Sequence, residues 1–209
     1  MLFISQLFSD PMGYLMWILL VVFSVCIHEY FHALTALSQG DSTAAEKGYL
    51  TLNPLVQIGV FPLILLLFIG ITWGGTPINP SRMRHKYSHA LVSFSGPLSN
   101  AMLFLMFCIL IAVLSKKNMM SEGALVLLGT GAVLNFVLFL FNMLPVPPLD
   151  GFSILSYFFP PIERSNSEIK SAAFFIIFII AFFSFGKLYY VGALFAETVI
   201  NTISGLLNG

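Results

Sequence analysis

The sequence predicts an all-α membrane protein, a polytopic helical bundle of about five spans with one further segment that dips into the membrane. Hydrophobic residues make up 58% of the chain and charged residues only 9%, whereas charged residues form about a quarter of a typical soluble domain. Several nearly charge-free runs approach the roughly 20 residues that a membrane helix needs; they are residues 14–27, 91–114, 124–141 and 172–185. Lipid is therefore the expected solvent of this fold.

We expect one membrane-embedded domain over residues 1–209, because most of the chain lies in or beside apolar segments. The formal net charge is zero, which gives no reason to invoke nucleic acid. Binding partners are expected in the lipid bilayer.

The first expected span, residues 12–38, carries the motif His28-Glu29-Tyr30-Phe31-His32. On a helix the two histidines lie on one face and can both give a ring nitrogen to one metal ion. Glu29 is the next residue round the helix after His28, where it can take a proton from water at the metal. Idle packing is the competing explanation, but a charged group at the centre of a membrane helix costs at least about 2.5 kcal/mol. The motif therefore predicts a zinc site with Glu29 as general base.

A hydrolytic zinc site usually has a third protein ligand. Asp150 is the best candidate, because it follows the proline-rich run Asn142 to Leu149 and precedes Gly151. Prolines end a helix, and broken backbone at membrane depth is tolerated only around a buried site or a wet cavity. Most of the other candidates lie in polar loops: Asp10, Asp41, Glu46, His85, His89, Glu122, Glu163, Glu168 and Glu197. Basic neighbours of His85 and His89 disfavour a second metal there, so these two are expected at the interface.

Sharing one metal requires an even number of crossings between His32 and Asp150. Residues 60–73 are too short for a span and contain Pro62, so we expect them to re-enter the membrane. The spans are then expected near residues 12–38, 90–114, 122–144, 169–186 and 188–207. Basic residues concentrate on one side of this layout, which places the zinc towards the cytoplasm.

Two further roles concern substrate. Asn142 is a candidate donor to the reaction's oxyanion, and Asn135, on nearly the same face, is explained equally well by helix packing. Residues 48–54 are rich in β-prone side chains, so Tyr49, Thr51 and Asn53 are candidates for a strand edge that pairs with extended substrate. A plain connecting loop is the equal alternative.

The chain resembles the site-two proteases, in their small prokaryotic form without a PDZ domain. Five pieces carry the resemblance: His28 to His32, Gly48 to Pro54, Pro77 to Pro80, Gly96 to Asn100, and Asn142 to Gly151. The resemblance implies one zinc held by His28, His32 and Asp150, with Glu29 as catalytic base. It also implies a multi-pass protein of the prokaryotic cell membrane that cleaves transmembrane protein substrates within or beside the bilayer.

Two features depart from the family pattern. Small members often carry His and Asp after the first Asn-Pro, where this chain has Leu55 to Val60, and Gly74-Gly75 replace a basic residue before the second Asn-Pro. Two other functions stay open. A metal transporter would also place histidines and acids in the membrane, and a non-catalytic scaffold could use zinc to hold helices together.

Overall fold

Every regular element among the described residues of the computed structural model is a helix; the structure describes residues 3–160 and 166–208. These residues form two compact units. The first holds residues 3–99 and 153–160, and the second holds residues 100–152 and 166–208. Two helices, α6 (Ser88–Lys116) and α8 (Asp150–Phe158), run unbroken through the boundaries between the units. The all-α fold expected from the composition is confirmed.

Helix α2 (Pro11–Ser38) is the long helix of the first unit and carries the histidine motif. It begins where the Asp10 carboxylate accepts a hydrogen bond from Gly13 N at 3.0 Å, with Pro11 in the first turn, a favourable start for a helix. It ends before Gly40, whose φ of +101° suits only glycine. Its 28 residues correspond to about 42 Å, which is enough to cross a bilayer.

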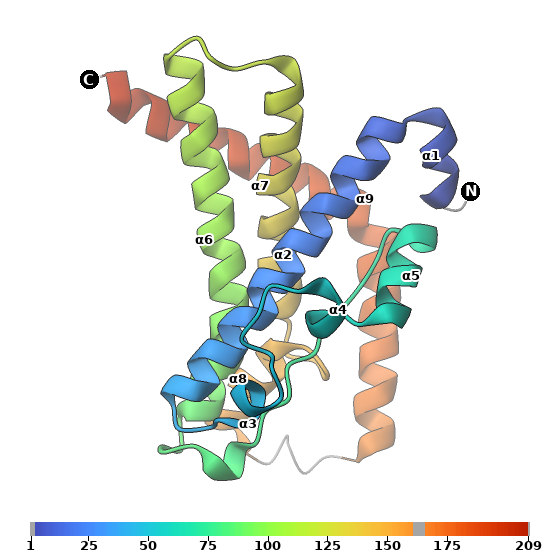
Figure 1. Ribbon diagram of the computed structural model, residues 1–209, viewed down its shortest axis with the longest axis vertical. Helices are drawn as coiled ribbons and strands as arrows, with labels where there is room; N and C mark the ends of the chain where they lie inside the picture. Colours follow the sequence, from blue (N-terminus) through green and yellow to red (C-terminus); the bar gives the residue numbers. More distant parts are fainter. Residues whose placement is uncertain (1–2, 161–165, 209) are drawn as a thin grey trace. The chain divides into compact units, whose positions relative to one another are not determined.

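The chain between α2 and α6 leaves and returns at the same end of α2. It contains the short helices α3 (Thr43–Glu46), α4 (Pro54–Gln57), α5 (Val60–Ile69) and η2 (Pro80–Arg82) (Figure 1). Two further short helices, η1 (Phe3–Ser5) and α1 (Gln6–Ser9), precede α2. Arg82 pairs with Glu46 at 2.9 Å, and Arg84 N donates to Gln39 O at 2.9 Å. Both ends of this excursion are therefore fastened together.

Helix α5 has ten residues, about 15 Å, and so it is too short to cross a bilayer of about 30 Å. Its end packs near the start of α2, where the Tyr14 hydroxyl donates to Leu67 O and the Trp17 indole donates to Gly70 O, both at 2.9 Å. The expectation that residues 60–73 are not a full span is confirmed.

Residues 70–79 then run back as an extended segment beside α2. Three contacts mark its course: Trp17 with Gly70, Glu29 with Thr76, and Asp41 with Asn79. Ten extended residues reach about 33 Å, which is close to the length of α2 from Trp17 to its end at Ser38. We call residues 70–79 the return segment.

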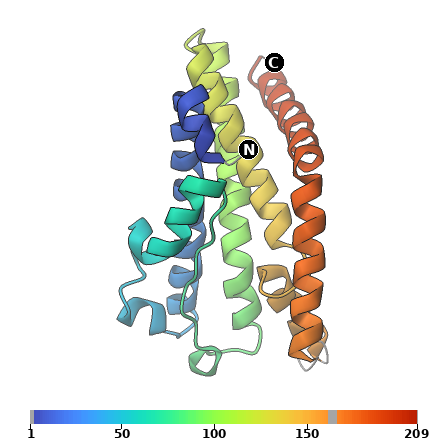
Figure 2. The same cartoon turned by 90° about the vertical axis from the view of Figure 1, so that its right-hand side faces the viewer.

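The second unit contains the later part of α6, α7 (Glu122–Asn142) and α9 (Ser167–Asn208). Helices α7 and α9 lie side by side (Figure 2), and Phe136 of α7 stacks on Phe195 of α9 at a ring separation of 4.8 Å. Asn100 Nδ2 donates to Asn135 Oδ1 at 2.9 Å, which joins α6 to α7. Both asparagines are fully buried.

The C-terminal part of the chain differs from the expectation. The spans expected at 169–186 and 188–207 are parts of one helix, α9, which has 42 residues and changes direction along its length (Figure 1). The reason is in the sequence, which has no proline after Pro161 to end the helix. Among the described residues, four helices are long and apolar enough to span a membrane; they are α2, α6, α7 and residues 186–207 of α9.

Candidate metal centre

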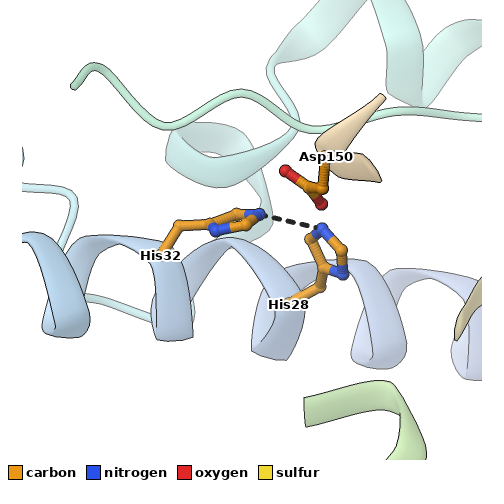
Figure 3. A group of neighbouring side chains, drawn as sticks. All are labelled: His28, His32 and Asp150. Atoms are coloured by element: carbon orange, nitrogen blue, oxygen red, sulfur yellow. Dashed lines mark hydrogen bonds between the residues drawn. The ribbon is translucent and has the colours of Figure 1, made fainter. Parts of the chain in front are cut away.

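His28 and His32 lie one helical turn apart on α2, with their rings edge to face at a centroid separation of 4.6 Å (Figure 3). Their Nε2 atoms are 3.0 Å apart, and the side chains are buried, with 7% and 5% exposed. The motif thus forms the shared face that its four-residue spacing predicts. Two imidazole nitrogens converge on one point in a largely dry environment.

The backbone of α6 fixes the ring of His32. His32 Nδ1 lies 2.8 Å from the carbonyl oxygen of Val92. A carbonyl oxygen only accepts, so Nδ1 carries the proton and donates it to Val92 O. Nε2 of His32 then keeps its lone pair, as a metal ligand requires.

Gly96 of α6 leaves room at the two histidines. A Cβ built on Gly96 would lie closer than 3.0 Å to Nε2 of both His28 and His32, nearer than real Cβ atoms come to any atom. Only glycine leaves this space open. A side chain at this position would therefore displace both candidate ligand atoms.

Asp150 is the first residue of α8. Gly151 follows it because a Cβ there would collide with the carbonyl oxygens of Met143 and Leu144. The ligand atoms of His28, His32 and Asp150 all lie within 4.8 Å of one another (Figure 3). Two imidazoles and one carboxylate are the donor set of many hydrolytic zinc sites, so the residues fit zinc. No other such group of three occurs in the described part of the chain.

Glu29 is held by the return segment. The Thr76 hydroxyl lies 2.8 Å from Glu29 Oε2 and 3.0 Å from the backbone oxygen of Glu29. Gly74 lies against the same side chain, because a Cβ on Gly74 would come within 3.0 Å of Glu29 Cγ, Cδ and Oε1. The residue as a whole is 7% exposed. Its position is therefore set by two residues that are far from it in sequence.

Asp41 lies in the loop that follows α2. Burial raises the pKa of its carboxyl group, but hydrogen bonds lower this pKa more, so that the net shift is downward. The donors are the Thr43 hydroxyl at 2.5 Å, Asn79 N at 2.6 Å and Thr43 N at 3.0 Å. The charge of Arg82 lowers this pKa further. Asp41 is thus an anionic anchor for the end of the return segment.

The two candidate asparagines have different surroundings. Asn142 Nδ2 donates to Leu138 O at 3.0 Å, within its own helix. Asn135 donates to Gly131 O at 2.9 Å and accepts from Asn100, as the helix-packing explanation expects. The oxyanion role of Asn142 stays a prediction.

The candidate substrate edge is irregular. Residues 47–53 form turns and bends without a strand, and the carbonyl oxygens of Tyr49 and Thr51 accept from Gln57 Nε2 at 2.8 and 2.6 Å. Asn53 caps α4 by accepting from Leu55 N. The β-strand that the side chains suggested is absent from this stretch because Gln57 and the Asn53 cap fold it into turns, and substrate contact by these residues stays a prediction.

Sequence reasoning missed Val92, Gly96, Gly74 and Thr76 as neighbours of the site. All four lie 45 to 68 residues after His28 or Glu29 along the chain, and no spacing rule connects them to the motif. Two of the four positions could have been singled out from the sequence. Gly96 lies in a piece that carries the family resemblance, and Gly74 lies where the chain departs from the family pattern. Thr76 gave no such signal.

Comparison with known proteins agrees with this arrangement. Residues 110–184 match the family described as peptidase family M50. The chain is 36% identical to "Putative zinc metalloprotease YwhC" of Bacillus subtilis over 82% of this chain and 80% of that protein. It is 30% identical to "Putative zinc metalloprotease Rip2" of Mycolicibacterium smegmatis over 81% of this chain and 69% of that protein. The Rip2 protein of Mycobacterium tuberculosis is 28% identical over 77% and 63%. No solved structure matches significantly.

Proposed function

Because this chain belongs to peptidase family M50, the site-two proteases, and is a membrane metalloprotease, we propose that it is a zinc-dependent intramembrane endopeptidase. It hydrolyses peptide bonds of transmembrane or membrane-proximal segments of other membrane proteins. The observation that carries the proposal is the convergence of His28, His32 and Asp150 to within 4.8 Å beside Glu29 on a helix long enough to span the bilayer.

In the proposed site His28, His32 and Asp150 are the zinc ligands. His32 offers Nε2 because its Nδ1–H is engaged by Val92 O. Zinc, when bound there, supplies a Lewis acid and makes water acidic enough to lose a proton near neutral pH. A site with three protein ligands leaves a position open for reactants, whereas a structural scaffold usually has four.

Glu29 is the proposed general base. It takes the proton of the attacking water and later gives it to the leaving amine. Its burial keeps competing water away from the carboxylate, and Thr76 holds one of its oxygens. Asn142 is the proposed donor to the oxyanion, because its amide nitrogen carries a second hydrogen beside the one given to Leu138 O.

The substrate must present extended backbone, since a helix hides its carbonyl groups in internal hydrogen bonds. Residues 48–54, with Tyr49, Thr51 and Asn53, are proposed to contact it near the membrane surface. The site is proposed to face the cytoplasmic half of a prokaryotic cell membrane, on the side where Lys47, Arg82, Arg84 and Lys86 gather.

The decisive experiment separates catalysis from metal binding. Glu29→Gln keeps the size of the side chain but removes the base. The protein should therefore retain zinc and cleave its substrate at least about 100-fold more slowly. His28→Ala should lose both zinc and cleavage. Cleavage of a model transmembrane substrate and zinc content are measured on the same preparations. Cleavage by Glu29→Gln at near the parental rate would overturn the protease mechanism. If the protein were a scaffold or a transporter, its function would change little in Glu29→Gln.

A further inference from the structure

We propose that Thr76 is a positioning residue for Glu29: its hydroxyl holds Oε2 of the carboxylate and leaves Oε1 as the atom that takes the proton. The proposal rests on the proposed function, in which Glu29 is the general base. It assigns a role to the return segment, which lies 47 residues beyond Glu29 in sequence.

The hydroxyl of Thr76 has two acceptors but only one proton. Oε2 of Glu29 lies at 2.8 Å and the backbone oxygen of Glu29 at 3.0 Å. A carboxylate is a stronger acceptor than a peptide carbonyl, so the proton points to Oε2 while Glu29 is ready to act as base. Because the Glu29 side chain is 7% exposed, little water competes for this bond.

The other carboxylate oxygen is treated differently. Oε1 has no hydrogen-bond partner within the described ranges of the chain, and Gly74 provides the space beside it. A Cβ on Gly74 would lie 2.6 Å from Oε1 and 2.7 Å from Cδ. Gly74 and Thr76 thus bracket the carboxylate, one by leaving room and the other by donating a hydrogen bond.

Thr76 can position Glu29 only if its own backbone is fixed. The preceding residue is held by a bond from Gly75 N to Gln57 O at 3.1 Å. Three residues later Asn79 N donates to the buried Asp41 carboxylate at 2.6 Å. The hydroxyl is therefore delivered by an anchored backbone, as pre-organisation of a catalytic carboxylate requires.

A purely structural role makes a different prediction. If the bond only fastens the return segment to α2, its loss should lower thermal stability and raise KM as the site loosens, without a specific effect on the chemical step. If Thr76 aims the base, kcat should fall while KM, zinc content and Tm stay close to the parent values. The two roles are separated by the same set of measurements.

The experiment compares four variants of the full-length protein in detergent with a model transmembrane peptide substrate. Thr76→Val keeps the shape and removes the hydroxyl, and we expect kcat to fall about 10- to 100-fold, as for the loss of a hydrogen bond to a charged group. Thr76→Ser should restore most of the rate. Gly74→Ala should lower kcat at least as much, because its Cβ displaces the carboxylate. Gly75→Ala is the matched control, since a Cβ there meets nothing within 4 Å, and should behave like the parent.

Parental kcat in Thr76→Val would overturn the proposal, while an inactive Glu29→Gln in the same assay would leave the proposed function intact. A rise in KM alone, or failure of Thr76→Ser to recover activity lost in Thr76→Val, would also overturn it. If Thr76→Val does not fold, the comparison of Gly74→Ala with Gly75→Ala decides: equal kcat in these two would show that the carboxylate is not constrained at this point.

Discussion

The imidazole Nδ1 of His32 lies 2.8 Å from the carbonyl oxygen of Val92, so the backbone of α6 orients a ring that is carried by α2. Val92 has no exposed surface, and this bond is therefore shielded from water. It fixes both the tautomer and the rotation of the ring before any metal binds. The affinity of the site should depend on how closely α6 approaches α2, as well as on the ligands.

The first prediction concerns metal content. Purified protein should hold about one zinc per chain, since the three proposed ligands converge in a prepared site. Asp150→Ala should lower zinc content well below one equivalent after dialysis against a weak chelator. Glu122→Ala, which removes an exposed carboxylate at the start of α7, is the control and should retain zinc. Elemental analysis measures both, and equal zinc in the two variants would remove Asp150 from the ligand set.

The second prediction concerns the space at Gly96. Gly96→Ala should reduce zinc content and cleavage together, because its Cβ would occupy the space beside both Nε2 atoms. Alanine favours a helix over glycine by up to about 1 kcal/mol, so loss of the helix does not explain the effect. Gly129→Ala in α7, where a Cβ meets nothing within 4 Å, is the matched control. Full zinc content in Gly96→Ala would show that this space is not part of the site.

The third prediction concerns topology. A single cysteine at Ser42 should react with a label on one side of the membrane and one at Ser121 with a label on the other, because α6 crosses between them. Ser42 is on the side where α6 begins, since Glu46 and Arg82 pair there. Labelling at Ser165 is expected on the Ser42 side; that residue lies outside the described ranges. Labelling of Ser42 and Ser121 from one side would contradict the assignment of α6 as a span.

The fourth prediction concerns pH. The folded pKa of Asp41 is lowered, so its stabilising effect is present above its unfolded pKa of about 3.9 and is lost as pH falls through the folded value. Asp41→Asn should lower stability at pH 7 by about 1 to 3 kcal/mol, as expected when hydrogen bonds to a buried charge are weakened. Thermal unfolding from pH 7 to pH 3 measures this. The variant should lose less stability on acidification than the parent; an identical pH dependence would exclude Asp41 as the anchor.

Local chemistry made part of the site predictable. The four-residue spacing of His28 and His32 fixes their shared face because both lie on one helix. The prolines before Asp150 indicated a break in the helix, and the structure places Asp150 at the start of α8 after that break. Residues 60–73 are too few to cross the membrane as a helix, so their number indicated a segment that is not a full span.

Contacts across the fold were out of reach of such reasoning. Thr76 meets Glu29 only because residues 70–79 run back along α2, and this path depends on the hydrogen bonds of Tyr14, Trp17 and Asp41. The continuity of residues 167–208 as one helix was missed for a related reason. Hydrophobic length was used to count crossings, whereas Gly186 is tolerated within one helix and does not end it.

The excursion between α2 and α6 has a consequence for how the protein is made. Insertion during synthesis recognises apolar helices of about 20 residues, and α5 with ten residues does not meet that length. We therefore expect α2 and α6 to enter the membrane first, with residues 39–87 left together at one surface. We expect α5 and the return segment to pack against α2 afterwards, where Tyr14 and Trp17 donate hydrogen bonds to them. The nascent enzyme should thus pass through an inactive stage in which the proposed zinc ligands of α2 are already in the membrane and the carboxylate of Glu29 still lacks its partner Thr76.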